Sequence, residues 1–201
     1  MTRRTQLIVK RSFDMVASAA LLLILSPLLV LIAAAIRVLT GSPILYTWNV
    51  IGTDGRPIKG YKFRTMVRNA DELKRELLDR NEMDGPVFKI KDDPRVTPLG
   101  RWLRKFSLDE LPQLWSVLKG DMSLVGPRPP LATEYAHFTD AQKRKLSVRP
   151  GMTSLWHVSG KPADFDEWVR LDLEYIERWS FGLDLQILFK TTLVVLTGKN
   201  H

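Results

Sequence analysis

The sequence has no cysteine and only three histidines among its 201 residues. Without thiols it forms no disulfide, thiolate metal site or cysteine nucleophile, and so few imidazoles argue against a zinc enzyme. It also lacks internal repeats, a G-x-G-x-x-G sequence and a Walker A sequence, so neither a dinucleotide-binding βαβ unit nor a P-loop is indicated. A hydrophobic share of 45% and a charged share of 26% exclude a disordered chain.

Positive charge is in excess. The 30 Lys and Arg residues outnumber the 22 Asp and Glu residues and give a formal net charge of +8. Such a chain attracts anionic partners, which include nucleic acid, acidic phospholipid and phosphorylated substrates, and charge alone does not choose among them. The length fits one domain with a sizeable core.

One long apolar block lies near the N-terminus. It runs for 22 residues, from Met15 to Ile36, and only Ser18, Ser26 and Pro27 in it are not apolar. As a helix it would measure about 33 Å at roughly 1.5 Å per residue, which is enough to cross a bilayer. A cleaved signal peptide is disfavoured, because its apolar region is usually about 7–15 residues long.

Two membrane arrangements remain for this block. Pro27 removes a backbone donor near the middle and must kink or break a helix, while Ser26 can hydrogen-bond a freed backbone group. Basic residues lie on both sides of the block, whereas a spanning helix usually has them mainly on one side. We expect a re-entrant helix, broken at Ser26 and Pro27, that enters and leaves the same face. A single transmembrane span is the alternative.

The remainder of the chain predicts a helix-rich, mixed α/β fold. Residues 43–52 and 56–66 are rich in strand formers and flank Asp54-Gly55, which predicts a β-hairpin. The hydrophobic patterns predict helices over 70–82, 99–118, 139–147, 169–179 and 183–196. The last helix carries five large apolar residues that would lie in a membrane interface or pack in the core: Leu185, Leu188, Phe189, Leu193 and Leu196.

The densest group of reactive side chains contains the adjacent carboxylates Asp109 and Glu110. Ser107 and Glu110 have the spacing of a helix capping box, which would account for Glu110 structurally, although Pro112 makes a regular helix start awkward. The alternative is a magnesium and phosphate site. Two carboxylates near a helix N-terminus would bind the metal, and Arg104 would hold phosphate oxygens.

Three further cations are candidates for phosphate binding. Arg128 stands between two prolines, which fix the backbone and lower the entropy lost when its guanidinium binds a phosphate. Lys62 and Arg64 alternate along the second predicted strand and therefore share one face. A rigid surface turn and a solvated strand face are the structural alternatives.

Four segments, taken together and in this order, carry a family resemblance. They read SFDMVASAALLLILSPLLVL (12–31), YKFRTM (61–66), SLDELPQLWSVLKGDMSLVGPRP (107–129) and RPGMTSLWHVSG (149–160). The pattern covers roughly residues 8 to 199. In it the chain resembles the bacterial sugar transferases, the monotopic phosphoglycosyl transferases that begin polyprenol-linked glycan assembly.

The resemblance implies an architecture and a location. Residues 1–40 would form the re-entrant membrane helix, and residues 41–201 a compact catalytic domain with amphipathic interfacial helices on the cytoplasmic face of the inner membrane. Larger members carry several spanning helices before this domain, and none precedes Met15 here. We therefore expect either a minimal enzyme or an excised catalytic domain.

The resemblance also implies a reaction. A sugar 1-phosphate would pass from a UDP-sugar to undecaprenyl phosphate with Mg²⁺ and release of UMP, as the first membrane step of exopolysaccharide, O-antigen or glycoprotein assembly. The family's acidic pair corresponds to Asp109, the expected nucleophile that forms a covalent phosphosugar intermediate, and Glu110, with both as metal ligands. Its upstream arginine corresponds to Arg104 and the arginine of its Pro-Arg-Pro motif to Arg128.

The sugar is not identified by these motifs. Members that build exopolysaccharide or O-antigen often read T-G-L-W-Q-V-S-G-R, and here Ser154, His157 and Lys161 replace the first Gly, the Gln and the Arg. These changes alter backbone freedom, hydrogen bonding and bidentate capacity. Inner-membrane lipids are further expected partners, and a homodimer is left open.

Two other functions are weighed against this one. A direct sugar transferase would release UDP, and Asp172 and Glu174 weakly imitate its metal-binding acidic motif. A membrane-anchored basic scaffold or nucleic-acid-binding protein would make the net charge central. No recognition helix or stacking platform is indicated, so we expect no nucleic-acid partner.

Overall fold

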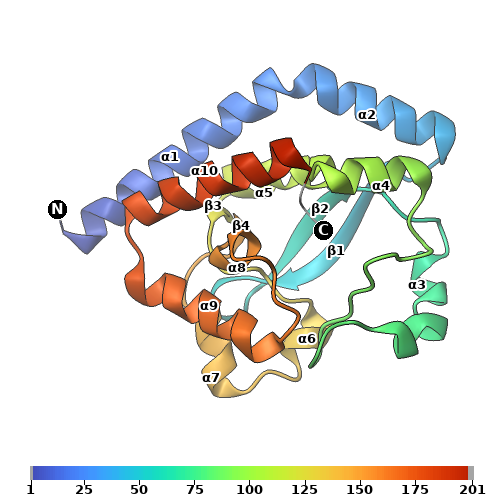
Figure 1. Cartoon of the computed structure of the whole chain (residues 1–201). Helices are drawn as coiled ribbons and strands as arrows, with labels where there is room; N and C mark the ends of the chain where they lie inside the picture. The colour runs from blue at the N-terminus through green and yellow to red at the C-terminus, as the bar shows by residue number, and fades with distance from the viewer. Residues whose placement is uncertain (1, 199–201) are drawn as a thin grey trace.

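A bent pair of helices at the N-terminus arches over the rest of the chain in the computed structural model, which describes residues 2–198 (Figure 1). The α-helices are α1 (Arg3–Ile24), α2 (Ser26–Leu39), α3 (Ala70–Leu73), α4 (Pro98–Lys105), α5 (Leu114–Lys119), α6 (Ala132–Tyr135), α7 (Asp140–Lys143), α8 (Leu155–Val158), α9 (Phe165–Arg178) and α10 (Phe181–Thr197). The 3₁₀ helices are η1 (Thr53–Gly55), η2 (Arg75–Arg80), η3 (Leu108–Gln113) and η4 (Arg144–Leu146). The strands are β1 (Leu45–Ile51), β2 (Pro57–Phe63), β3 (Ser123–Val125) and β4 (Gly151–Thr153). The helix-rich, mixed α/β class is confirmed; residues 199–201 of the predicted catalytic domain lie outside the described part.

The apolar block forms two helices that meet at the predicted break. α1 ends at Ile24, α2 begins at Ser26, and the two are bent by 60°. Pro27 lies in the first turn of α2, where its missing N–H costs little, and the Ser26 hydroxyl donates to the Leu23 carbonyl at 2.8 Å. Within residues 2–198 no single helix has both the length and the apolar composition to cross a membrane, and only the bent pair together reaches them.

The first half of α1 is tied to the rest of the chain by charged side chains. Lys10 pairs with Asp184 of α10 at 2.6 Å. Asp14, only 2% exposed, accepts a hydrogen bond from the Ser123 hydroxyl at 2.8 Å. Arg11 donates to two backbone carbonyls at the end of α5 at 2.7 and 2.9 Å. The N-terminal segment therefore packs into the rest of the chain at this end, a connection that sequence patterns did not indicate.

The predicted hairpin is confirmed as the antiparallel pair β1 and β2. Its turn contains Asp54 and Gly55, both in the left-handed region, with φ of 55° and 78°, which suits this residue pair. Trp48 lies opposite Gly60 in the register. A Cβ atom at Gly60 would come within 2.6 Å of the indole, so glycine lets this ring lie across the neighbouring strand.

A second, parallel pair joins β3 and β4, two short strands that the sequence analysis did not predict. Two glycines permit their approach. A Cβ atom at Gly151 would lie 2.1 Å from the Gly126 nitrogen, and one at Gly126 would lie 2.4 Å from the Arg149 carbonyl oxygen. This contact brings the Pro127-Arg128-Pro129 loop against the segment that leads into α8.

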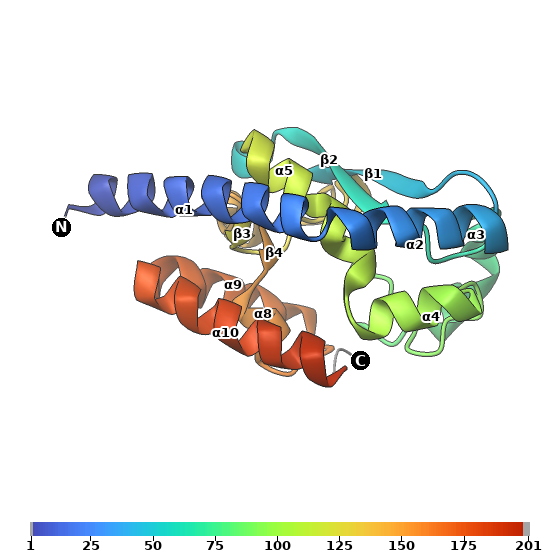
Figure 2. The same ribbon diagram turned by 90° about the horizontal axis from the view of Figure 1, so that it is seen from above.

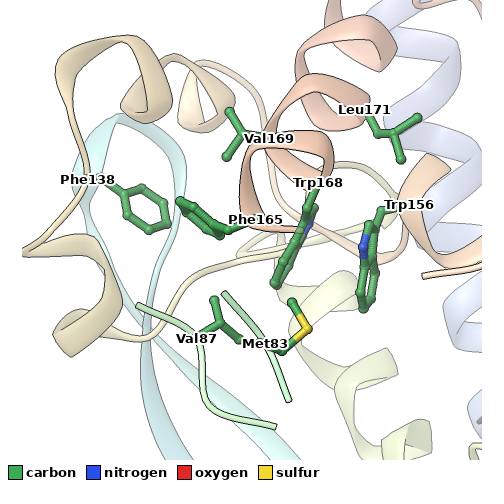
Figure 3. Packing of buried hydrophobic residues seen from close by; sticks show 8 residues of the cluster. All are labelled: Met83, Val87, Phe138, Trp156, Phe165, Trp168, Val169 and Leu171. Atoms are coloured by element: carbon green, nitrogen blue, oxygen red, sulfur yellow. The ribbon is translucent and has the colours of Figure 1, made fainter. Parts of the chain in front are cut away.

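Three clusters of buried side chains make up the core. The first joins α8 and α9 to the loop before Lys89 and contains Met83, Val87, Phe138, Trp156, Phe165, Trp168, Val169 and Leu171 (Figure 3). The second lies beneath α1 and contains Leu114, Val117, Met122, Leu124, Val125, Tyr175 and Ile187. The third joins α2 to the hairpin and α4 and contains Ile32, Ile36, Phe63 and Leu103.

The single helix predicted over 99–118 is wrong. α4 ends at Lys105, Ser107 takes a left-handed conformation with φ of 51°, and the 3₁₀ helix η3, which contains Pro112, precedes α5. A proline inside a helix removes a backbone hydrogen bond, and this explains why the chain turns here instead of continuing.

Two charged helices are shorter than predicted, and the last two are confirmed. Residues 70–82 form only α3 followed by η2, and residues 139–147 form α7 followed by η4. α9 begins before the predicted residue 169, because the Asp164 carboxylate accepts the first free N–H groups of that helix. On α10 the side chains of Leu185, Phe189, Leu193 and Leu196 are exposed, whereas Leu188 packs against the second cluster.

In the view from above, α10 lies beside the α1 helix, and α4 lies beside α2 (Figure 2). The end of α10 approaches α4, since a Cβ atom at Gly198 would lie 2.8 Å from the Lys105 side chain. The exposed apolar side chains of α10 and of the bent helix pair thus belong to helices that are neighbours in space.

Candidate active site

The acidic pair lies at the turn between α4 and α5. Because the chain reverses at Ser107, η3 carries Asp109 into the interior, where it is only 7% exposed. The predicted capping box is wrong, since the Ser107 side chain makes no capping hydrogen bond. The Glu110 side chain instead reaches a cation on the hairpin. The structural alternative for Glu110 therefore does not hold.

That cation is Lys62 of β2. Its ammonium lies 2.6 Å from Glu110 Oε1 and 5.0 Å from the centre of the Trp48 ring, over its face. The face of the strand on which Lys62 lies is therefore turned toward the acidic pair and is not merely solvated.

The two carboxyl groups have different electrostatic environments. Burial and the charge of Glu110 together raise the pKa of Asp109 to about 6, although the charges of Lys62 and Arg104 act in the opposite direction. Burial acts on Glu110 in the same direction, but the charge and hydrogen bond of Lys62 outweigh it and hold the pKa of Glu110 below its usual range. Glu110 is therefore firmly ionised. The negative charge of Asp109 is destabilised by its surroundings.

Arg104 approaches the pair from α4. Its Nε donates to the Thr65 hydroxyl at 2.9 Å, and its charge lowers the pKa of Asp109. The structure thus brings Arg104, Asp109, Glu110 and Lys62 together, four of the six predicted catalytic and phosphate-binding residues.

Arg128 follows β3 on the proline-flanked loop. Its guanidinium carbon lies 5.2 Å from the centre of the Trp168 ring and 6.0 Å from that of Trp156. The two indoles are themselves stacked, with centres 4.6 Å apart and planes at 20° (Figure 3). A guanidinium over an indole face is stabilised by cation–π attraction, so the two tryptophans position Arg128. Sequence patterns missed both tryptophans, since only the folded chain brings residue 168 to residue 128.

Arg64 occupies a different environment from Lys62. It is 7% exposed, and its Nη2 donates to the Thr40 and Gly41 carbonyls at 2.8 and 2.7 Å. It lines the same cleft as the acidic pair, but its visible contacts are with the end of α2. A phosphate-binding role for it stays a prediction.

One lysine and one histidine near Glu110 were not predicted as site residues. Burial, together with the charges of Lys89 and Arg128, lowers the pKa of Lys161 to about 8, and Glu110 opposes this. Burial lowers the pKa of His157 to about 3, so its ring is neutral at pH 7, and Nδ1 lies 2.8 Å from the Ser154 hydroxyl. His157 and Lys161 replace the Gln and the Arg of the family pattern, and this difference was the only indication in the sequence that they belong to the site.

One cleft of about 1140 Å³ is lined by the acidic pair and by the cations named above, which are Lys62, Arg64, Lys89, Arg104, Arg128 and Lys161. Over the part of the chain that the structure describes, twelve Lys and Arg residues and six Asp and Glu residues line it, so it attracts anions of the size of a nucleotide diphosphate. Residues 2–198 contain no cluster of three or more His, Cys, Asp or Glu that could hold a metal ion. Two carboxylates completed by substrate phosphates suit Mg²⁺, which is commonly bound in that way.

The acidic pair of α9 does not resemble a metal site. Asp172 is fully buried, with its Oδ2 2.5 Å from the Lys145 ammonium. Glu174 pairs with Arg170 and Arg178 on the outside of the helix. The two carboxylates therefore point to different sides of α9 and do not form the metal-binding motif on which the direct-transfer alternative rested.

Comparison with known proteins places the chain in a family. The sequence profile of the family described as "Bacterial sugar transferase" matches residues 5–198, nearly the whole chain. The chain belongs to the bacterial sugar transferase family. The acidic pair, its lysine and the proline-flanked arginine lie within the matched range, so the candidate active site belongs to the part of the chain that the family shares.

Several bacterial sugar transferases are close in sequence. "Galactosyl transferase CpsE" of Streptococcus agalactiae is 45% identical over 96% of this chain and 43% of its own length. "Undecaprenyl-phosphate galactose phosphotransferase" of Salmonella typhimurium is 44% identical over 98% of this chain and 42% of its own length. "Exopolysaccharide production protein ExoY" of Rhizobium meliloti is 41% identical over 94% of this chain and 86% of its own length. The chain thus spans less than half the length of the first two relatives.

Proposed function

We propose that this protein transfers a sugar 1-phosphate from a UDP-sugar to undecaprenyl phosphate and releases UMP, as the first membrane step in the assembly of a bacterial polysaccharide. The observation that carries the proposal is the buried Asp109, which lies beside the Lys62–Glu110 ion pair in a cationic cleft. The names of relatives that act on galactose or glucose make UDP-galactose and UDP-glucose the first donors to test.

In the first step an oxygen of the Asp109 carboxylate attacks the phosphorus that bears the sugar. The bond from this phosphorus to the bridging oxygen breaks, and UMP leaves with that oxygen. A sugar-phosphoryl aspartate remains. Burial favours this attack because the carboxylate is poorly solvated, and the neighbouring cations Arg104 and Lys62 keep it ionised.

In the second step a phosphate oxygen of undecaprenyl phosphate attacks the same phosphorus. The phosphorus–oxygen bond to Asp109 breaks, so the free carboxylate and undecaprenyl diphosphate-sugar are formed. Glu110, held ionised by Lys62, accepts a proton if the acceptor phosphate arrives as a monoanion. Arg128, fixed over Trp168, binds donor phosphate oxygens with its two-pronged guanidinium.

Asp109 and Glu110 are the residues that would hold Mg²⁺ in this cleft, together with oxygens of the donor diphosphate. When bound, the ion supplies positive charge that offsets the charge developing on the diphosphate. A two-carboxylate site of this kind is weak without substrate, which agrees with the absence of a third acidic ligand among the described residues.

The N-terminal helix pair would place this cleft at the cytoplasmic face of the inner membrane. Its bend of 60° and its exposed apolar side chains, among them Val16, Leu23, Val30 and Leu31, support a re-entrant helix. The exposed face of α10, with Phe189 67% exposed, would lie in the lipid interface. Undecaprenyl phosphate, itself a lipid, would then reach the cleft along the membrane surface.

Intact-protein mass spectrometry and nucleotide analysis test the reaction. Detergent-purified protein mixed with UDP-galactose or UDP-glucose and Mg²⁺, without acceptor, should release one equivalent of UMP and gain the mass of a sugar phosphate. Asp109→Asn should abolish both signals. Glu110→Gln should slow turnover and leave adduct formation measurable.

Three results would contradict the proposal. Release of UDP in place of UMP would indicate direct sugar transfer. An adduct that persists in Asp109→Asn would place the nucleophile elsewhere. Strictly sequential kinetics, with no UMP until acceptor is added, would replace the covalent intermediate by direct displacement.

A further inference from the structure

Arg64 carries a buried positive charge at the point where β2 meets the end of α2. Its Nη2 donates to the carbonyls of Thr40 and Gly41 and lies 3.0 Å from the Thr40 hydroxyl. Its Nε and Nη1 atoms are buried and have no hydrogen-bond partner. One nitrogen thus explains why the side chain lies here, and two nitrogens remain without an acceptor.

Such an arrangement is costly unless an anion completes it. A buried polar group without a partner loses its hydration and gains nothing in return. No carboxylate in the described part of the chain forms an ion pair with Arg64, whereas the buried Arg95 is matched by Asp93 at 2.6 Å. The charge of Arg64 is therefore available to an anion that is not part of the chain.

A second arginine lies beside the first. The Arg68 guanidinium covers Gly41 so closely that a Cβ atom there would lie 2.3 Å from its Nη2. Burial and the charge of Arg68 lower the pKa of Arg64. Arg68 is exposed and, within residues 2–198, also has no ion pair. Two guanidinium groups that repel each other without a shared counter-charge are typical of an anion site.

These arginines form a group separate from the cations around Arg128. Lys89 and Arg128 each lie 6.0 Å from the centre of the Trp156 ring, whereas the Arg64 guanidinium contacts the carbonyls of Thr40 and Gly41 at the end of α2. Both groups line the cleft that contains Asp109 and Glu110. One cleft thus contains two groups of cations besides the acidic pair, as transfer between two phosphorylated substrates requires.

The Arg64 end lies next to the apolar helix pair. α2 ends one residue before Thr40, and the side chains of Val38 and Leu39 are 81% and 69% exposed. Arg64 is also close to the reacting groups, since alternate residues of a strand are about 6–7 Å apart and Lys62 contacts Glu110 at 2.6 Å. A phosphate held here would have its apolar tail beside exposed apolar side chains and its head near Asp109.

We propose that Arg64 and Arg68 bind the monophosphate of the polyprenyl acceptor, and that the donor diphosphate is bound by the separate group around Arg128. The assignment rests on the proposed function and specifies which substrate each group of cations takes. Arg64 supplies the two unpartnered nitrogens, and Arg68 closes the site from the exposed side.

The test separates the two half-reactions in the full chain. We would measure the UMP burst with UDP-galactose or UDP-glucose in the absence of acceptor, and then steady-state turnover against undecaprenyl phosphate. Arg68→Gln should leave the burst amplitude and rate unchanged and raise the KM for undecaprenyl phosphate about tenfold. Arg64→Lys keeps the positive charge but loses the two parallel N–H donors of the guanidinium, and it should have the same effects.

Arg37→Gln is the matched control. Arg37 also lies at the end of α2, is exposed and does not line the cleft. It reports any general effect of removing one positive charge near the membrane. The variant should keep the parental KM for undecaprenyl phosphate, and added phosphatidylglycerol should not compete with the acceptor in the parent protein. Competition by phosphatidylglycerol would mean that the site binds any lipid phosphate and would overturn the assignment.

Binding is measured separately from turnover. Isothermal titration with farnesyl phosphate, a short polyprenyl monophosphate, should show a Kd about tenfold weaker for Arg68→Gln than for the parent or Arg37→Gln. An unchanged Kd would refute the site even if the protein proves to have no UMP burst. A parent without burst or adduct would instead refute the proposed reaction. Loss of the burst in a folded Arg68→Gln variant would move these arginines to the donor site.

Discussion

The Lys62 ammonium lies 2.6 Å from Glu110 Oε1, and this contact joins the hairpin to the acidic segment across 48 residues of sequence. Lys62 stands two residues before Arg64 and opposite Tyr46 in the hairpin register, while Glu110 lies on the 3₁₀ turn that follows α4. The pair thus links β2, which leads directly into Arg64, to the buried acidic turn.

Lys62→Met should lower turnover roughly 10- to 100-fold, because a hydrogen bond to a charged group is worth about 1.5–3 kcal/mol. Without Lys62 the pKa of Glu110 should rise. The free energy of unfolding should fall by about 1–3 kcal/mol, since both side chains are only about a quarter exposed and Glu110 loses its hydrogen-bond partner. Steady-state kinetics and thermal unfolding measure the two effects.

Lys119→Met is a suitable control for this variant. Lys119 forms an ion pair of similar length with Asp121, 2.7 Å, outside the cleft. Its loss should leave turnover at the parental value. Equal losses in Lys62→Met and Lys119→Met would show that the effect comes from net charge and not from the acidic pair.

Arg128→Lys should lose most activity although it keeps the charge. An ammonium reproduces neither the two parallel hydrogen bonds of a guanidinium nor its flat contact with the Trp168 ring. The protein should remain folded, because the loop backbone is fixed by prolines and by the Gly126–Gly151 contact. Near-parental turnover in the purified variant would assign Arg128 to a structural turn.

The hairpin could be predicted because its signal is local. Asp54 and Gly55 tolerate positive φ, and the flanking residues favour strands, so the turn and both strands follow from a dozen adjacent residues. The break at Ser26 and Pro27 is local in the same sense. The acidic pair and Arg128 could be predicted as site residues from their local sequence, because two carboxylates are adjacent and the arginine stands between two prolines.

Other features depend on contacts between distant segments. The helical pattern of 99–118 is real on each side of Ser107, and Pro112 explains locally why one helix does not continue. The contact of Glu110 with Lys62 and the burial of Asp109, however, depend on distant segments. The stack of Trp156 and Trp168 under Arg128 joins three separate segments. No local pattern distinguishes these two tryptophans from ordinary core residues.

Removal of divalent metal tests the role of the two carboxylates as ligands. EDTA should abolish the UMP burst, and Mg²⁺ should restore it. Glu110→Gln should raise the Mg²⁺ concentration needed for half-maximal burst roughly tenfold or more, because an amide oxygen is a weaker ligand than a carboxylate. Glu82→Gln, a cleft residue apart from the pair, should keep the parental requirement. A burst that survives EDTA would contradict the magnesium site.

Pro27→Leu should change the topology of the N-terminal helix pair. Leucine removes the break, and the 22-residue apolar block is then long enough to span the bilayer. The chain has no cysteine, so Arg3→Cys can be labelled selectively. In cells the label should enter from the cytoplasmic side in the parent background and from the periplasmic side with Pro27→Leu.

Arg56→Cys, next to the exposed hairpin turn, controls this experiment. It should be accessible from the cytoplasm in both backgrounds. The hairpin follows the helix pair, and Pro27→Leu is expected to move only the segment that precedes the pair. Periplasmic labelling of Arg3→Cys in the parent background would end the re-entrant assignment.

The last prediction concerns the buried pair of α9 and separates stability from catalysis. Lys145 and Asp172 are 1% and 0% exposed, so Asp172→Asn leaves an ammonium buried without its counter-charge. Breaking such a pair costs about 3–5 kcal/mol, which corresponds to a fall in Tm of roughly 6–20 °C for a chain of this size. Glu174→Gln removes only exposed ion pairs and should change the free energy of unfolding by less than about 1 kcal/mol.

A double variant decides whether charge neutrality is the cause. Lys145→Met combined with Asp172→Leu replaces the pair by apolar side chains and should recover most of the lost Tm. Folded Asp172→Asn protein, assayed below its Tm, should keep a measurable UMP burst and the parental Mg²⁺ requirement, since neither residue of the pair lines the cleft. If Glu174→Gln lost activity at an unchanged Tm, or if both carboxamide variants shared an altered Mg²⁺ requirement, α9 would carry a metal site after all and direct sugar transfer would again be the better mechanism.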